Sequence, residues 1–166
     1  MVIGTAGFTA ATALYKLQCI GQQPEKGPIV VTGATGGVGS LAVALLSNAG
    51  YTVTAVTGKK DVTDYLTFLG AATIEPRTFV SDSSGKALLQ PKWAGAIDTA
   101  GGTILETLLK GCMPEGCIVS TGLVESPQLS LSVYPFILNG VSLLGVGSAG
   151  MEMPVRQMIW KKLSKE

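Results

Sequence analysis

Three glycines with a fixed spacing form the strongest chemical pattern in this sequence. They lie in the run Gly33-Ala34-Thr35-Gly36-Gly37-Val38-Gly39, which follows a short β-branched stretch, 29–32, and leads into a helix-like stretch. Between a strand and a helix, this pattern is typical of a loop that binds a dinucleotide pyrophosphate, because glycines let the backbone approach the phosphates and the helix start offers N–H donors. We expect phosphate binding here; the alternative is a glycine-rich turn without a ligand.

Two other kinds of nucleotide-binding protein do not fit these residues. Ser40 follows the last glycine, and no Gly-Lys-Ser/Thr is present to hold a β-phosphate and magnesium, which argues against a nucleoside triphosphatase. A short-chain dehydrogenase, which is a complete enzyme on one domain of this type, needs a Tyr-x-x-x-Lys pair. No tyrosine in the sequence has a lysine four residues further on.

The end of the next expected strand, 51–57, indicates which dinucleotide binds. An NAD site places an Asp or Glu about 20 residues beyond the loop to bind the ribose 2′-hydroxyl. Here the strand ends in Thr57-Gly58-Lys59-Lys60, with no acid at its tip. Thr57 and Lys59 suit a 2′-phosphate, so we expect NADP(H), although the lysines could instead belong to a solvated turn. Asp61, the nearby acid, is expected to cap a helix.

Other chemistry has little support in the composition. The sequence has no histidine, and Cys112 and Cys117 are five residues apart, unlike the pairs of structural zinc sites, so we expect no metal site. No residue is identified as catalytic. A net charge of +1 argues against nucleic acid or an anionic membrane as a partner. We find no signal peptide and no membrane-spanning run, and we expect a cytoplasmic protein.

Strand-like and helix-like runs alternate along the whole chain, and the fold that they form must position the glycine loop and the residues after the second strand. This alternation predicts an α/β Rossmann fold, a doubly wound parallel sheet of about six strands with helices on both faces. Ser81 to Gln90 is a weak helix or a loop. Strands are expected over 29–32, 51–57, 71–74, 93–99, 117–121 and 141–146, and helices over 8–19, from the glycine loop to 48, and over 61–69, 103–110 and 154–163.

Several further motifs accompany the glycine loop. They are Gly4-Thr5-Ala6-Gly7-Phe8-Thr9-Ala10, Thr57-Gly58-Lys59, Trp93-Ala94-Gly95-Ala96-Ile97-Asp98-Thr99, Thr121-Gly122-Leu123 and Pro135-Phe136-Ile137-Leu138. Together they resemble the medium-chain dehydrogenase/reductase superfamily, and within it the zinc-independent quinone-oxidoreductase and acryloyl-CoA reductase branch. The resemblance covers nearly the whole chain.

The resemblance implies the cofactor-binding domain of an NADPH-dependent reductase, which transfers hydride to an activated double bond in a quinone or an enoyl-CoA thioester. It also implies site residues for each part of the cofactor. These are Gly33, Thr35, Gly36, Gly37, Val38 and Gly39 at the pyrophosphate, Thr57, Gly58 and Lys59 at the 2′-phosphate, Arg77 near the adenosine, and Leu123, Ile137 and Ser148 beside the nicotinamide. Leu123 and Ile137 fit ordinary core packing equally well.

The sequence also departs from its relatives. Asn139 stands where they often carry Arg, and Gly147 where they often carry Asp, so the nicotinamide end is less well defined than the phosphate end. Such enzymes carry a catalytic domain ahead of the cofactor domain, and we expect residues 1–166 to lack it, with the small-molecule substrate bound mainly by that domain. The alternative is a stand-alone NADP(H)-sensing module. The strand 141–146 is a candidate edge for a homodimer.

Overall fold

The computed structural model describes residues 3–163, which contain six strands and six α-helices. They alternate along the chain except between β3 and β4, which are joined by a 3₁₀ helix and a loop. The strands are β1 (Ile29–Thr32), β2 (Val53–Thr57), β3 (Thr73–Pro76), β4 (Trp93–Asp98), β5 (Cys112–Ser120) and β6 (Ser142–Gly145). The helices are α1 (Gly4–Cys19), α2 (Gly37–Asn48), α3 (Thr63–Phe68), α4 (Gly102–Lys110), α5 (Tyr134–Asn139) and α6 (Met153–Leu163), with short 3₁₀ helices η1 (Pro24–Lys26) and η2 (Arg77–Val80).

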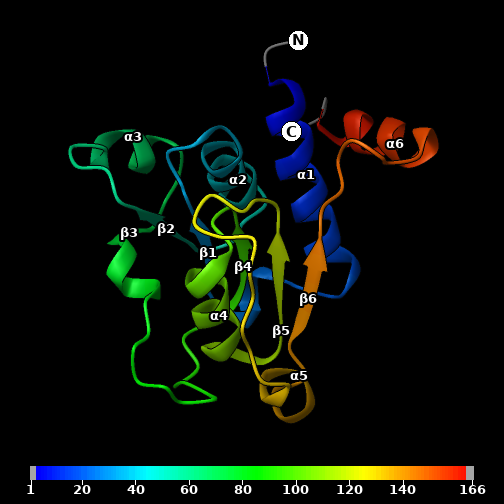
Figure 1. Ribbon diagram of the computed structural model, residues 1–166. Coiled ribbons are helices and arrows are strands. Elements are labelled where there is room, and N and C mark those ends of the chain that lie inside the picture. The colour runs from blue at the N-terminus through cyan, green and yellow to red at the C-terminus, as the bar shows by residue number, and fades with distance from the viewer. Residues whose placement is uncertain (1–2, 164–166) are drawn as a thin grey trace.

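The strands form one sheet in the order β3-β2-β1-β4-β5-β6, and every neighbouring pair is parallel (Figure 1). This is the strand order of a doubly wound dinucleotide-binding sheet. The order reverses between β1 and β4, so the chain winds outward from the centre in both directions. The predicted fold class is therefore confirmed.

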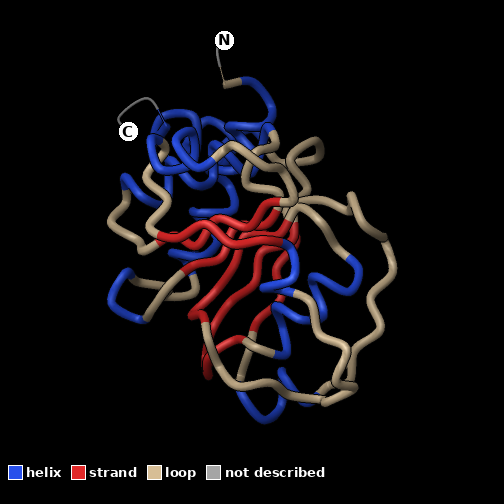
Figure 2. Tube along the Cα trace, turned by 90° about the vertical axis from the view of Figure 1, so that its left-hand side faces the viewer, coloured by secondary structure: helices blue, strands red, loops and turns tan. Residues whose placement is uncertain are grey.

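Helices cover both faces of the sheet, which lies between them in Figure 2. Successive side chains of a strand point to opposite faces, and β1 shows this directly. Ile29 and Val31 pack in one core cluster with α1 and α2, whereas Val30 packs in another with α4. Both faces of the central strands are buried, so β1 and β2 consist mainly of apolar residues with a few buried threonines and do not alternate between apolar and exposed polar residues. The helix α6 packs on α1 through Ile159 and a stacked Phe8–Trp160 pair.

The structure corrects several sequence predictions. The segment that contains Ile137 forms the helix α5, which was not predicted. The strand β5 begins at Cys112 rather than at 117, and α1 begins at Gly4 rather than at Phe8. Residues 81–90 form a loop. Asp61 is not a helix cap: α3 begins at Thr63, no side chain caps it, and Asp61 itself adopts a left-handed conformation with a φ of 57°.

Among residues 3–163, none of the helices could span a lipid bilayer.

Candidate functional site

A cleft of about 420 Å³ lies over the carboxyl ends of β1, β2 and β4. This is where the strand order reverses, and open α/β sheets bind their ligands outside the carboxyl ends of the strands at such a point. The lining residues come from the ends of β1 and β2, from η2, from the start of α4 and from the connections that follow β1 to β5. They are Thr32, Gly33, Thr35, Gly36, Val56, Lys59, Arg77, Thr78, Ser81, Thr99, Ala100, Thr103, Ile104, Val124 and Glu125.

The glycine loop forms the centre of this cleft. Gly33 has a φ of +58°, and a Cβ there would lie 2.3 Å from the Thr99 hydroxyl, so the turn requires glycine. Gly36 precedes α2, and Gly37 is its first residue. Gly39 packs on the turn, because a Cβ at this position would lie 2.2 Å from the Gly33 carbonyl oxygen. The glycines thus seat the start of α2 against the end of β1, with its first turn at the cleft.

Two helices begin beside the cleft, and their first turns differ in charge and in bonding. No side chain caps α2, and its first turn contains no acidic residue, so its N–H groups and positive dipole end are available to an anion. The start of α4 is occupied by two carboxylates. Asp98 accepts hydrogen bonds from the N–H groups of Ala100 and Gly101, and Glu125 accepts one from the N–H of Ile104. An incoming phosphate is therefore favoured at α2 and disfavoured at α4.

Asp98 also connects the strands that carry the loop. The Thr32 hydroxyl donates to Asp98 Oδ1 over 2.7 Å and accepts from the Thr99 N–H over 2.9 Å, and the Thr99 hydroxyl donates to the Thr32 carbonyl. Asp98 is fully buried. This burial raises the pKa of its carboxyl above the ordinary value of 3.8, against the opposing effect of the hydrogen bonds that it accepts. The network fixes β1 and β4 side by side beneath the glycine loop.

A cationic wall closes the cleft beyond β2. Thr57 is almost completely buried, and its hydroxyl accepts the Lys59 N–H over 3.1 Å and lies 3.3 Å from the Thr35 hydroxyl. Thr57 therefore shapes the turn that presents Lys59. Gly58 leaves room for Arg77, because a Cβ there would lie 2.7 Å from Arg77 Nε. Lys59 and Arg77 both line the cleft, so the structure brings these two predicted residues together.

None of the three residues expected at the nicotinamide lines this cleft. Leu123 follows β5 and Ser148 follows β6, so both belong to the carboxyl end of the sheet. The Ser148 carbonyl accepts a hydrogen bond from the Arg156 guanidinium over 2.6 Å. Ile137 lies on α5, which directly precedes β6 and therefore stands at the amino end of the sheet (Figure 1). The structure does not bring Ile137 and Leu123 together, and both side chains are exposed rather than in the core.

Several cleft residues were missed by the sequence reasoning. They follow the ends of β3, β4 and β5, and one rule could have found them, namely that ligands bind at the carboxyl ends of parallel strands. That rule does not say which side chains of a long connection turn inward. The missed residues are Thr78, Ser81, Thr103, Ile104, Val124 and Glu125.

The cysteines lie away from the cleft. Cys112 and Cys117 are buried within the sheet, and burial raises the pKa of each thiol to about 12. Cys19 is exposed at the end of α1. Among residues 3–163, no three His, Cys, Asp or Glu side chains are grouped so that they could hold a metal ion.

Comparison with known proteins agrees with this geometry. The family model described as zinc-binding dehydrogenase matches residues 37–164. The chain is 46% identical over 166 residues to the "Putative quinone oxidoreductase YhfP" of Bacillus subtilis and 40% identical over 166 residues to the "Acrylyl-CoA reductase AcuI" of Ruegeria pomeroyi. Each alignment covers 100% of this chain and 50% of the relative, so the chain spans about half the length of the relatives it matches.

Solved structures show the same similarity. The crystal structure of Bacillus subtilis YhfP with NAD bound superposes with a TM-score of 0.96 at 46% identity, over 99% of this chain and 50% of the other. The structure of Escherichia coli YhdH with bound NADPH superposes with a TM-score of 0.95 at 44% identity and the same coverage. The family resemblance that the motifs indicated is therefore confirmed.

Proposed function

The chain belongs to the zinc-binding dehydrogenase family, and from that premise we propose that it is the NADP(H)-binding domain of a zinc-independent reductase. The substrate class that we propose is an activated double bond, in a quinone or an enoyl-CoA thioester. In this proposal residues 1–166 form one cofactor-binding domain, and most contacts to the substrate come from a domain outside them. Relatives that are twice as long and bear the names of a quinone oxidoreductase and an acrylyl-CoA reductase support it.

One observation carries the assignment of the cofactor: the cleft places the uncapped start of α2 next to a cationic wall. A dinucleotide phosphate has two anionic parts, the pyrophosphate and the 2′-phosphate, and the cleft offers each a separate positive region. An NAD site would instead present a carboxylate at the end of β2. The residues there are Thr57, Gly58 and Lys59, none of which is acidic.

The residues of the cleft fit such a group. Gly33, Thr35 and Gly37 would receive the pyrophosphate with backbone N–H groups. The Gly36 N–H donates to the Gly33 carbonyl over 2.8 Å, so Gly36 would contribute room for the phosphate rather than a donor. Val38 and Gly39 would hold the first turn of α2 in place. Gly33 and Gly36 line the cleft without side chains that would keep a phosphate away from the backbone. Thr57 and Gly58 would shape the turn from which Lys59 binds the 2′-phosphate, and Arg77 would lie against the adenosine.

When bound, the nicotinamide would supply the hydride, and the protein would hold it in place and exclude water. We propose Leu123 and Ser148 as its neighbours, since both follow strand ends at the carboxyl edge of the sheet. Ile137 has no such support, because α5 lies at the other end. The exposed Ile137 and Leu138 instead suit burial against another domain or a second copy of the chain, and β6, an edge strand, is our proposed dimer edge.

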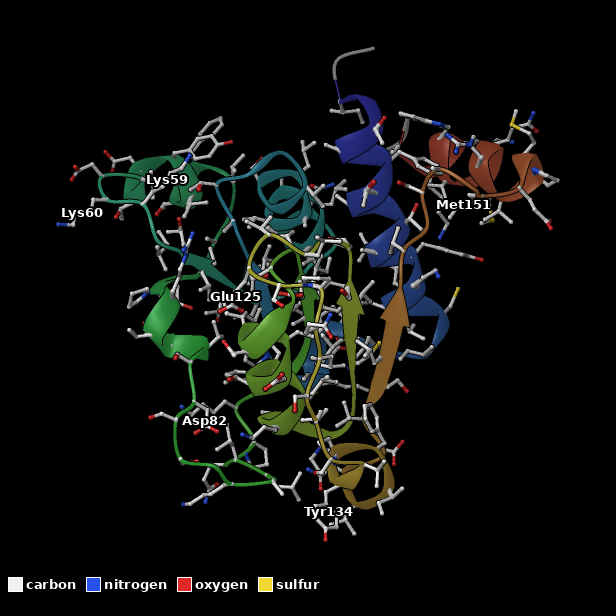
Figure 3. The ribbon with its side chains drawn as sticks, viewed as in Figure 1. Lys59, Lys60, Asp82, Glu125, Tyr134 and Met151 are labelled. Atoms are coloured by element: carbon white, nitrogen blue, oxygen red, sulfur yellow. The ribbon has the colours of Figure 1, made fainter. Side chains whose placement is uncertain are left out.

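Titration with NADPH and, separately, with NADH tests the proposal, with nucleotide fluorescence or heat as the readout. We expect NADPH to bind more tightly. Lys59→Ala should weaken NADPH binding about tenfold, the effect of one charge-assisted contact, and leave NADH binding nearly unchanged. Lys60→Ala is the matched control, because Lys60 extends away from the molecule and does not line the cleft (Figure 3).

Two results would contradict the proposal. A preference for NADH would refute the assignment of the 2′-phosphate site to Thr57, Gly58 and Lys59. Equal losses in the Lys59→Ala and Lys60→Ala variants would show that binding responds to net charge and not to the geometry of the cleft.

A further inference from the structure

Glu125 is a charged residue of the cleft to which the proposed function gives no role. It lies in the connection after β5, which folds back over the start of α4 (Figure 3). Glu125 Oε1 accepts the Thr103 hydroxyl over 2.9 Å, and Oε2 accepts the Ile104 N–H over 3.1 Å. A carboxylate oxygen can accept two hydrogen bonds. Since Glu125 is exposed and lines the cleft, each oxygen retains an acceptor site for a ligand.

The two sides of the cleft carry opposite charges. Lys59 and Arg77 form its cationic wall, and Glu125 stands on the α4 side. The start of α4, which could otherwise attract a phosphate, is already occupied by Asp98 and Glu125. A phosphate would therefore bind at the cationic wall or at α2, and the part of a dinucleotide near Glu125 must be uncharged.

The surroundings of Glu125 suit a flat, uncharged ring. Ala100, Ile104 and Val124 line the same side of the cleft and provide apolar surface. Pockets for small molecules are mostly apolar, with a few polar groups that fix orientation. Adenine is uncharged, and its exocyclic amino group is a hydrogen-bond donor. A carboxylate, which only accepts hydrogen bonds, matches that donor.

We propose that Glu125 is a specificity-determining residue that accepts a hydrogen bond from the exocyclic amino group of the adenine ring. This assignment rests on the proposed function, since it requires a dinucleotide in the cleft. Hypoxanthine carries a carbonyl oxygen in place of the amino group, and that oxygen would face the carboxylate without a proton between them. The site therefore selects adenine and rejects hypoxanthine.

The test compares NADPH with nicotinamide hypoxanthine dinucleotide phosphate in its reduced form. For the wild-type chain, we expect the dissociation constant of the hypoxanthine analogue to exceed that of NADPH about tenfold, as for the loss of one hydrogen bond to a charged group. In Glu125→Gln the ratio should fall to near unity, because an amide can either accept from the amino group or donate to the carbonyl.

Glu106→Gln is the matched control. Glu106 Oε1 accepts the Ser130 N–H over 2.7 Å and so ties the same connection to the same helix, but Glu106 does not line the cleft. This variant should keep the tenfold ratio. Equal binding of both nucleotides by the wild-type chain, or a ratio that survives in Glu125→Gln, would overturn the assignment while leaving the proposed function intact. Absence of binding of either nucleotide would overturn both.

Discussion

Gly39→Ala should destabilise the protein because the helix α2 and the turn after β1 meet at this position. A Cβ at Gly39 would lie 2.2 Å from the Gly33 carbonyl oxygen, 2.8 Å from its carbonyl carbon and 2.9 Å from Ala34 Cα. All three neighbours are backbone atoms, so no side chain can rotate away. The helix must move from the strand by roughly 1 Å to restore ordinary contact distances.

The expected loss follows from two opposing contributions. Forcing an extra methyl group into a well-packed region costs about 1–3 kcal/mol, and the upper part of this range applies where only the backbone can yield. Alanine recovers about 1 kcal/mol over glycine in a helix. We therefore expect the free energy of unfolding of Gly39→Ala to fall by about 2 kcal/mol.

Gly37→Ala provides the control in the same turn of the same helix. The nearest atom to a Cβ there is Ala6 Cβ at 3.5 Å, an ordinary contact, so the variant should be as stable as the wild type or slightly more stable. Urea unfolding followed by fluorescence measures the stability of both variants. An unchanged slope of the free energy of unfolding against urea concentration would confirm that each variant exposes as much surface on unfolding as the wild type. Equal stability of the two variants would refute the argument that contact with Gly33 decides the packing.

Two further predictions concern buried and paired carboxylates. Asp98→Asn should lower the free energy of unfolding, measured by urea titration, by about 1–3 kcal/mol. The NH₂ group of asparagine would replace one carboxylate oxygen, so a hydrogen-bond donor would face a backbone N–H, which is also a donor. Unchanged stability would count against the hydrogen-bond network described for Asp98. The Lys110 ammonium beside Asp82 holds the pKa of that carboxyl below its ordinary value of 3.8. A carboxyl group whose pKa is lower in the folded state than in the unfolded state stabilises the folded protein at pH values above its ordinary pKa. This stabilisation is lost as the pH falls below that ordinary pKa and through the lowered one. Lys110→Met should therefore be less stable than the wild type at about pH 7, with a difference that shrinks toward about pH 3; a difference that grows as the pH falls would contradict this.

The sequence was sufficient to predict a doubly wound parallel sheet because the features that determine this fold are local or recur along the chain. Strands buried on both faces are mostly apolar without alternation, as 29–31 and 93–97 are, and helices between them force parallel pairing. The glycine loop was also predictable, since Gly33 and Gly39 are required by a turn and a close contact within seven residues of sequence.

Other features depend on contacts that no local pattern contains. The helix α5 has six residues, too few to show a helical period, and its motif was interpreted without a position along the sheet. The prediction therefore placed Ile137 beside Leu123, whereas the structure has it at the opposite end of the sheet. Asp61 looked like a cap, but the turn continues for two residues before α3 begins at Thr63. The bond between Glu125 and Ile104 joins residues 21 positions apart, and only the folded connection reveals it.

The same dependence on long-range contacts explains why one glycine turn is open to a ligand and another is not. Both β1 and β4 are followed by adjacent glycines that lead into a helix, Gly36-Gly37 and Gly101-Gly102. A Cβ at Gly101 would lie 2.3 Å from the Ser126 carbonyl oxygen, and one at Gly102 would lie 2.7 Å from Glu125 Oε2. These glycines make room for the chain's own connection after β5. At Gly36 the nearest atom to a Cβ is the Gly33 carbonyl oxygen at 3.2 Å, within the same loop. No distant segment comes within 4 Å of a Cβ at Gly36, and at Gly37 only Ala6 Cβ does, at 3.5 Å. These two glycines therefore leave the backbone open to the cleft, as the proposed phosphate site requires.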